Sequence, residues 1–139
     1  MVEKDRLTEN FRRFVSAVDG FQGVLEITAS DYSENVEDAI NNGKIQKFEY
    51  CTELSWKLLK NFLLEIHGID AKTPKLVVKE FFLLSAFDDE GYECFLDMID
   101  ERNRLSHIYS DNAFLEVLKK LPSYLSVMMI IRDYLEQNI

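Results

Sequence analysis

Residues 97–110 read Asp-Met-Ile-Asp-Glu-Arg-Asn-Arg-Leu-Ser-His-Ile-Tyr-Ser and combine an apolar helical pattern with a high density of polar side chains. A helix advances about 100° per residue. Three apolar side chains then lie on one side, where they can face a core: Met98, Leu105 and Ile108. The opposite side carries two adjacent polar stripes: Arg102, Ser106 and Tyr109 in one, and Asn103 and His107 in the other.

Two of these polar residues suit the chemistry of phosphate esters. The guanidinium of Arg102 offers a planar fork of donors that fits a phosphate group. The imidazole of His107 can exchange a proton near neutral pH. The spacing alone is also compatible with a solvated helix face on which the histidine is satisfied by its neighbours.

The order of these residues resembles a known signature. Arg102, four residues and then His107, with Tyr109 two positions later, resemble the Arg-x4-His-x-Tyr motif of HEPN domains. The chain resembles, more narrowly, the nucleotidyltransferase substrate-binding proteins, which are small HEPN proteins typically encoded beside a minimal nucleotidyltransferase. Residues 47–60, Lys-Phe-Glu-Tyr-Cys-Thr-Glu-Leu-Ser-Trp-Lys-Leu-Leu-Lys, are similar to the aromatic-Glu, Glu-Leu-x-Trp-Lys helix of that family. Both segments in this order are far more specific than the Arg-x4-His string.

The resemblance implies a site that two copies of the motif form across a homodimer. HEPN ribonucleases cleave RNA there without a metal ion. By this resemblance Arg102 holds the scissile phosphate, His107 transfers a proton, and Asn103 orients the phosphate or the imidazole. Tyr109 corresponds to the tyrosine that accepts adenylyl groups from the nucleotidyltransferase partner.

Four more residues are expected to contact a partner or substrate: Ser106, Glu53, Trp56 and Lys57. A structural interpretation stays open for three of them. Glu53 and Lys57 also form a favourable i, i+4 pair on a helix surface. Trp56 belongs to a residue type that more often lies in a core or an interface.

Length and composition predict one helical domain over residues 1–139, because 47% hydrophobic residues are enough for a sizeable core. No apolar run approaches the roughly 20 residues that a membrane-spanning helix needs. The N-terminus lacks the apolar region of a signal peptide. We therefore expect a cytoplasmic protein that does not contact a membrane.

The sequence predicts neither a disulfide nor a metal site. Cys51 and Cys94 fall in separate predicted helices without Cys-x-x-Cys spacing. His67 and His107 are the only histidines and do not form a His-x-x-x-His pair. We expect buried reduced thiols, no metal ion and no cofactor.

The formal charge of −9 argues against a general nucleic-acid binder, because polyanions are bound through lysine and arginine. RNA or a nucleotide can then bind only through a local group of cations. The candidates are Arg102, Arg104, Lys72, Lys75 and Lys79. The same acidity suits a more basic protein partner.

Hydrophobic periodicity predicts five helices and no strand. The expected helices span about 4–28, 44–67, 73–87, 89–109 and 111–137, with residues 30–43 as a connector that contains a short helix at 33–37 and a turn at 41–43. Pro122 is expected to kink the last helix or restart it at Ser123. The fold is therefore an all-α, antiparallel up-and-down bundle of four or five helices. Two helices carry more apolar residues than one buried stripe requires, which favours a homodimer.

Two functions of different classes follow. The first is a nucleotidyltransferase substrate-binding protein, the dimeric and non-catalytic partner of a minimal nucleotidyltransferase encoded nearby. The alternative is a metal-independent HEPN ribonuclease, the toxin of a toxin–antitoxin pair, neutralised by adenylylation at Tyr109. A third interpretation is a helical interaction domain in which the motif occurs by chance.

Overall fold

The computed structural model describes residues 2–84, 87–105 and 111–139. The elements in chain order are α1 (Val2–Leu25), the 3-10 turn η1 (Ala29–Asp31), α2 (Glu34–His67), α3 (Pro74–Leu83), α4 (Asp89–Leu105) and α5 (Asp111–Asn138). These described residues contain no β-strand, and the predicted all-α fold is confirmed.

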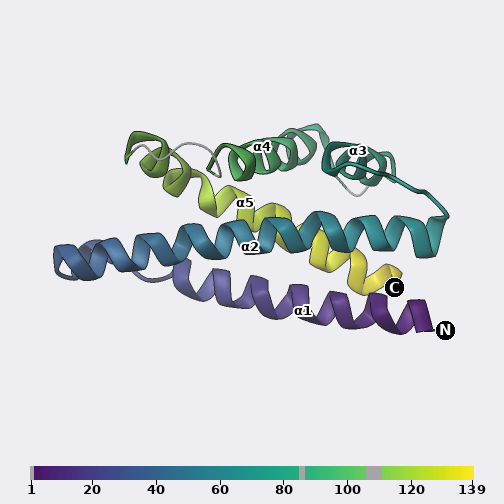
Figure 1. Cartoon of the computed structure of the whole chain (residues 1–139), viewed down its shortest axis with the longest axis horizontal. Coiled ribbons are helices and arrows are strands. Elements are labelled where there is room, and N and C mark those ends of the chain that lie inside the picture. The colour runs from purple at the N-terminus through teal and green to yellow at the C-terminus, as the bar shows by residue number, and fades with distance from the viewer. Residues whose placement is uncertain (1, 85–86, 106–110) are drawn as a thin grey trace.

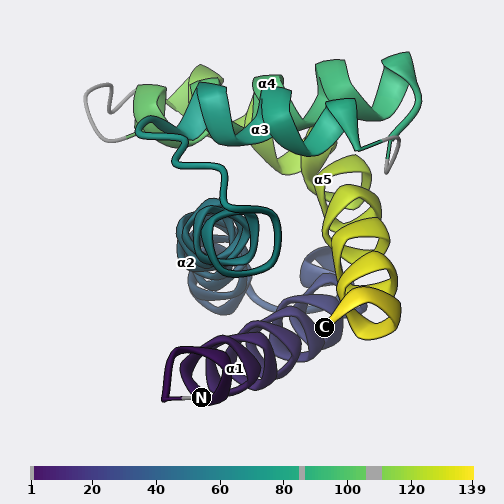
Figure 2. The same ribbon diagram turned by 90° about the vertical axis from the view of Figure 1, so that its right-hand side faces the viewer.

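The long helix α2 is the centre of the bundle. Figure 1 shows α2 running the length of the molecule, with α1 along one side and α3 and α4 along the other. Viewed along α2 in Figure 2, α1, α5 and the pair of α3 and α4 lie around it. α2 contacts every other helix and η1. The extra apolar residues of α2 therefore serve a helix that packs against several neighbours.

The predicted connector at residues 30–43 was largely wrong, because α2 already begins at Glu34 and continues through Gly43. The side chain of Asn42 donates to the carbonyl oxygen of Asp38 at 2.8 Å and so stays within the helix. Lys44 Nζ donates to the carbonyl oxygen of Ile27 at 2.9 Å, which ties this part of α2 to the end of α1. One glycine costs a helix only about 1 kcal/mol, so these contacts and packing outweigh the turn signal.

Two predicted helix boundaries are confirmed. α2 ends at His67, followed by Gly68 in the left-handed conformation with φ 67°, which a glycine adopts without strain. α3 begins at Pro74 after Thr73, whose hydroxyl oxygen accepts a hydrogen bond from the amide of Leu76 at 3.3 Å.

Of the two effects predicted for Pro122, a kink or a restart at Ser123, the restart was wrong, because α5 continues through Pro122. A proline inside a helix removes one amide donor and costs about 3 kcal/mol. The buried side of α5 offsets this cost with a row of fully or almost fully buried residues: Val117, Leu121, Tyr124, Met128, Ile131 and Leu135. Packing on both sides of the proline thus keeps the helix continuous.

Tyr124 joins three helices in the core. Tyr124 is 1% exposed, and its ring stacks on Phe48 of α2, with ring centroids 5.1 Å apart. Its hydroxyl donates to Asp97 Oδ2 of α4 at 2.5 Å. Burial and the neighbouring Asp97 carboxylate raise the pKa of Tyr124 above its ordinary value, so the phenol remains a donor. Tyr124 thereby fixes α2, α4 and α5 at one level of the bundle.

Replacing Tyr124 with phenylalanine should lower the free energy of unfolding by about 1–3 kcal/mol, because the Asp97 carboxylate loses a hydrogen bond in a partly buried position. Urea unfolding monitored by circular dichroism measures the change. The control is Tyr32→Phe, whose ring is 53% exposed and should change stability by no more than about 0.5 kcal/mol. Equal effects of both substitutions would contradict the importance of the buried hydrogen bond.

Candidate functional site

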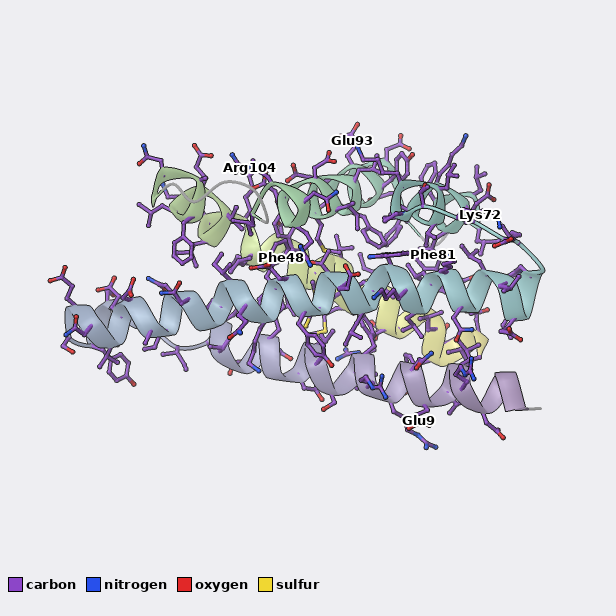
Figure 3. All side chains as sticks on the ribbon, viewed as in Figure 1. Glu9, Phe48, Lys72, Phe81, Glu93 and Arg104 are labelled. Atoms are coloured by element: carbon purple, nitrogen blue, oxygen red, sulfur yellow. The ribbon has the colours of Figure 1, made fainter. Side chains whose placement is uncertain are left out.

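Helices α2 and α4 bring the two notable sequence segments together. Residues 47–60 lie in α2, and Asp97 to Leu105 form the second half of α4. In Figure 3, Phe48 marks α2 and Arg104 marks the end of α4, and the two helices are in contact at this level. The packing of the core therefore places residues separated by about 50 positions of sequence in one cluster.

Arg102 lies in the last turn of α4, with its side chain 28% exposed. A cation is favoured at this end of a helix by the helix dipole. Its guanidinium lies 3.9 Å from Glu49 Oε2 of α2, and its charge also acts on Glu53 one helical turn further along α2. The arginine is thus held at the surface between two carboxylates.

Glu53 is the most highly connected carboxylate of this cluster. It accepts a hydrogen bond from Trp56 Nε1 at 3.1 Å and pairs with Lys57 Nζ at 3.2 Å. Partial burial by itself would raise its pKa. The hydrogen bonds from Trp56 and Lys57, with the charges of Lys57 and Arg102, outweigh burial and lower the pKa below its ordinary value. Glu53 is therefore ionised at neutral pH.

Two residues on this face of α2, Glu49 and Thr52, were missed in the sequence analysis. Glu49, Thr52, Glu53 and Trp56 follow the spacing i, i+3, i+4, i+7 and so share one face of α2. The Thr52 hydroxyl is completely buried and has no hydrogen-bond partner in the described part of the chain. Glu49 could have been found by its position one turn before Glu53. We see no sequence signal for Thr52, because its burial depends on tertiary packing.

The structure places only part of the predicted site. Arg102, Glu53, Trp56 and Lys57 belong to one cluster, and Asn103 follows Arg102 at an exposed position of α4. The other predicted residues, Ser106, His107 and Tyr109, lie outside the described residues. Their arrangement around Arg102 therefore stays a prediction.

Most of the other candidate cations for a nucleic acid are engaged in ion pairs. Arg104 pairs with Glu101 at 2.8 Å and with Glu116 of α5 at 3.6 Å. Lys72 pairs with Asp70 at 2.6 Å, and Lys75 pairs with Asp100 at 2.9 Å. Lys79 is exposed. These ion pairs leave no group of unpaired cations among the candidates that the sequence suggested.

Metal and thiol chemistry find little support in the described residues. No three or more of their histidine, cysteine and acidic side chains are grouped so that they could hold a metal ion. Both cysteines are free thiols. Cys51 is buried, as predicted, whereas Cys94 is only partly buried, which corrects the prediction for that residue. Burial raises the pKa of Cys51 to about 12, against the opposing effect of Lys47, so this thiol is a poor nucleophile.

None of the described helices is long and apolar enough to span a membrane.

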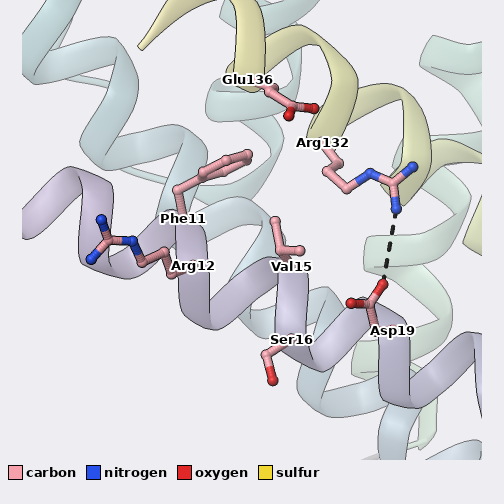
Figure 4. Close-up of a pocket in the computed structure, with 7 residues that line it drawn as sticks. All are labelled: Phe11, Arg12, Val15, Ser16, Asp19, Arg132 and Glu136. Carbon is pink, nitrogen blue, oxygen red and sulfur yellow. Dashed lines mark ion pairs between the residues drawn. The ribbon is translucent and has the colours of Figure 1, made fainter.

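A separate hollow of about 570 Å³ lies between α1 and α5. Figure 4 shows Phe11 and Val15 on its α1 side and Arg132 reaching from α5 toward Asp19, 4.0 Å away. Its lining contains two arginines and two acidic residues: Arg12, Arg132, Asp19 and Glu136. Because these charges balance, the hollow favours neither an anion nor a cation.

The lowered pKa of Glu53 predicts how its contribution to stability depends on pH. A depressed pKa stabilises the fold above the pKa of the unfolded chain, about 4.3, and this contribution is lost as pH falls through the folded value. At pH 7, Glu53→Gln should therefore lower stability by about 0.3–1 kcal/mol, since the pair is partly exposed. The difference from the unsubstituted protein should shrink below about pH 4.

Thermal unfolding between pH 3 and pH 7 measures this difference. The control is Glu9→Gln, which removes the same charge from an exposed position of α1. A difference for Glu53→Gln that stays constant over this pH range would contradict the proposed interaction.

Comparison with known proteins supports the helical fold. The chain resembles the crystal structure of a protein from Thermus thermophilus, with a TM-score of 0.77 and 25% sequence identity over 88% of this chain and 98% of that chain. Among curated proteins the chain has no match. Residues 9–137 match the family described as "Nucleotidyltransferase substrate binding protein like". With nearly the whole chain matched, the protein belongs to this family.

Proposed function

We propose that this protein is the dimeric partner subunit of a minimal nucleotidyltransferase. Its contact surface is the Arg102 cluster, which we define as Arg102, Glu49, Glu53, Trp56 and Lys57. The observation that carries the proposal is the meeting of Arg102 with Glu49 and Glu53, which joins the two family-like segments in one surface cluster. The family description names a nucleotidyltransferase and supports the same partner.

The electrostatics of the cluster favour a protein partner over a free polyanion. Arg102 is faced by two carboxylates, and the whole chain carries a net charge of −9. A polyanion would have to approach against this negative charge. A protein surface can instead offer a carboxylate to Arg102 and a cation to Glu49 and Glu53. Tyr109 would be the residue that the partner modifies.

The homodimer in this proposal is supported by exposed apolar side chains on the central helix. Tyr50, Leu64 and Ile66 of α2 are 52%, 45% and 41% exposed. In a second copy the same helix would carry the same side chains, so a twofold contact would cover both sets. Such a contact would also bring the two Arg102 clusters to one side of the complex.

A second candidate is the metal-independent ribonuclease, and one observation favours it. The Arg102 side chain is partly exposed at the end of α4, directly before the segment that contains Ser106 and His107. A phosphodiester could therefore reach the guanidinium from solvent. The ribose 2′-hydroxyl would attack phosphorus, His107 would take part in proton transfer, and the 5′ oxygen would leave.

Co-expression with the nucleotidyltransferase encoded beside this protein tests the first proposal. The two proteins should co-purify, and light scattering should give a mass that contains two copies of this chain. Arg102→Ala should weaken the complex about tenfold or more, because a hydrogen bond to a charged group contributes about 1.5–3 kcal/mol. Isothermal titration calorimetry measures the affinity.

Arg13→Ala, which removes an exposed arginine from α1, is the matched control and should leave the affinity within about twofold. Failure of the two proteins to bind would refute the partner role. Equal weakening by both arginine substitutions would refute the role of the Arg102 cluster.

RNA cleavage by the purified protein without metal tests the second candidate. A ribonuclease of this kind should leave 2′,3′-cyclic phosphate and 5′-hydroxyl ends. Arg102→Ala and His107→Ala should each reduce the rate about a hundredfold or more, since general acid–base catalysis contributes 10²–10⁴-fold. Arg12→Ala on α1 should cleave normally. No cleavage by a dimer that is unmodified at Tyr109 would leave the partner subunit as the function.

A further inference from the structure

Helix α2 exposes a row of residues at seven-residue spacing. Val36, Tyr50 and Leu64 are 43%, 52% and 45% exposed, and the side chain of Lys57 is 58% exposed. Gly43 occupies the remaining position, where an added Cβ atom would meet no atom within 4 Å. The row therefore forms an open stripe along most of the helix. We call these five residues the α2 stripe.

The geometry of the α2 stripe is that of a helix–helix seam. Seven residues advance a helix by about 700°, only about 20° less than two turns, so the stripe stays on one side of α2. Its 28 residues of separation correspond to about 42 Å. A second set of residues lies three positions after each member and completes a heptad pattern: Ala39, Gln46, Glu53, Lys60 and His67.

The charges at these positions indicate which partner helix would be complementary to this face of α2. In an antiparallel pairing of two α2 helices about Ser55, Glu53 of each copy meets Lys57 of the other. Tyr50 then meets the aliphatic and ammonium parts of the second copy's Lys60, a favourable cation–π pair. The centre of this face, at Tyr50, Glu53, Lys57 and Lys60, is thus complementary to itself in this register.

Other registers lose this complementarity. A shift of one heptad in one direction places Lys57 opposite Lys60 of the second copy. A shift in the other direction places Lys57 opposite Gln46 and Glu53 opposite Tyr50. A parallel pairing places Lys57 beside Lys57. The first shift and the parallel pairing bring like charges together, which is unfavourable, and the second shift lacks the pairs of opposite charge. The charges therefore favour the register centred on Ser55.

We propose that the face of α2 formed by the α2 stripe and the second set binds the same face of a second copy. The two helices are antiparallel in the register centred on Ser55, so the α2 stripe of one copy faces the second set of the other. This inference rests on the homodimer of the proposed function and adds its geometry. The second copy's Lys57 would then contact Glu53, which already accepts from Trp56 and receives the field of Arg102. Each copy thereby contributes a cation to the Arg102 cluster of the other, and both clusters lie near the twofold axis.

Reciprocal charge reversal tests the register. In a dimer of the Lys57→Glu variant, Glu53 of each copy faces an acidic side chain at position 57 of the other. In a dimer of the Glu53→Lys variant, Lys57 of each copy faces a basic side chain at position 53 of the other. Each variant alone should dimerise about thirtyfold more weakly or worse, because both intermolecular pairs become repulsive. An equimolar mixture should form a heterodimer within about tenfold of the original affinity, since every crossing pair is opposite in charge again. Sedimentation velocity over a concentration series measures the dissociation constants.

The mixture separates the intermolecular effect from an effect within one chain. Both variants also lose their own Glu53–Lys57 ion pair, and mixing cannot restore it, whereas mixing restores the pairs between copies. Lys79→Glu, which reverses an exposed charge on α3, is the control and should dimerise normally. Circular dichroism confirms that each variant is folded.

Three outcomes would overturn the register. These are a Lys57→Glu variant that dimerises normally, a mixture that does not associate, and an unsubstituted protein that is monomeric at every concentration. The last outcome would also remove the homodimer from the proposed function. Binding of the nucleotidyltransferase would still be decided separately, by the titration with Arg102→Ala.

Discussion

Burial of α2 against every other helix is the constraint on which the structure depends. α2 supplies nine of the buried residues of the described chain, and its partners approach from three directions. The stack of Phe48 on Tyr124 and the hydrogen bond from Tyr124 to Asp97 set the level at which α4 and α5 meet it. The position of Arg102 relative to Glu49 and Glu53 follows from this packing and from no local preference of α4.

The Arg102 cluster shows how an acidic protein can keep one cation in a defined place. The chain has a net charge of −9, yet Arg102 stays partly exposed at a defined place, 3.9 Å from Glu49 and within the field of the ionised Glu53. Such an arrangement gives specificity more than affinity, because partly exposed ion pairs contribute little net free energy. A partner must present charges in the matching order.

Two helices continue through residues that favour a break, and both do so because of tertiary contacts. Gly43 lies inside α2, near the contact of Lys44 with the end of α1. Pro122 lies inside α5, between the buried Leu121 and Tyr124. Local propensities amount to about 1 kcal/mol for glycine and about 3 kcal/mol for proline. Burial of one or two large side chains contributes as much or more.

The sequence by itself determined the helical class, the caps at Gly68 and Thr73, the Glu53–Lys57 pair and the family resemblance. These features depend on neighbours within one or two helical turns, so they can be predicted from hydrophobic periodicity and residue type. Only the tertiary structure decided that α2 begins at Glu34, that α5 passes Pro122, that Glu49 faces Arg102 and that Thr52 is buried. Those features depend on contacts between distant segments, and a local pattern carries no information about which helices meet or at what level.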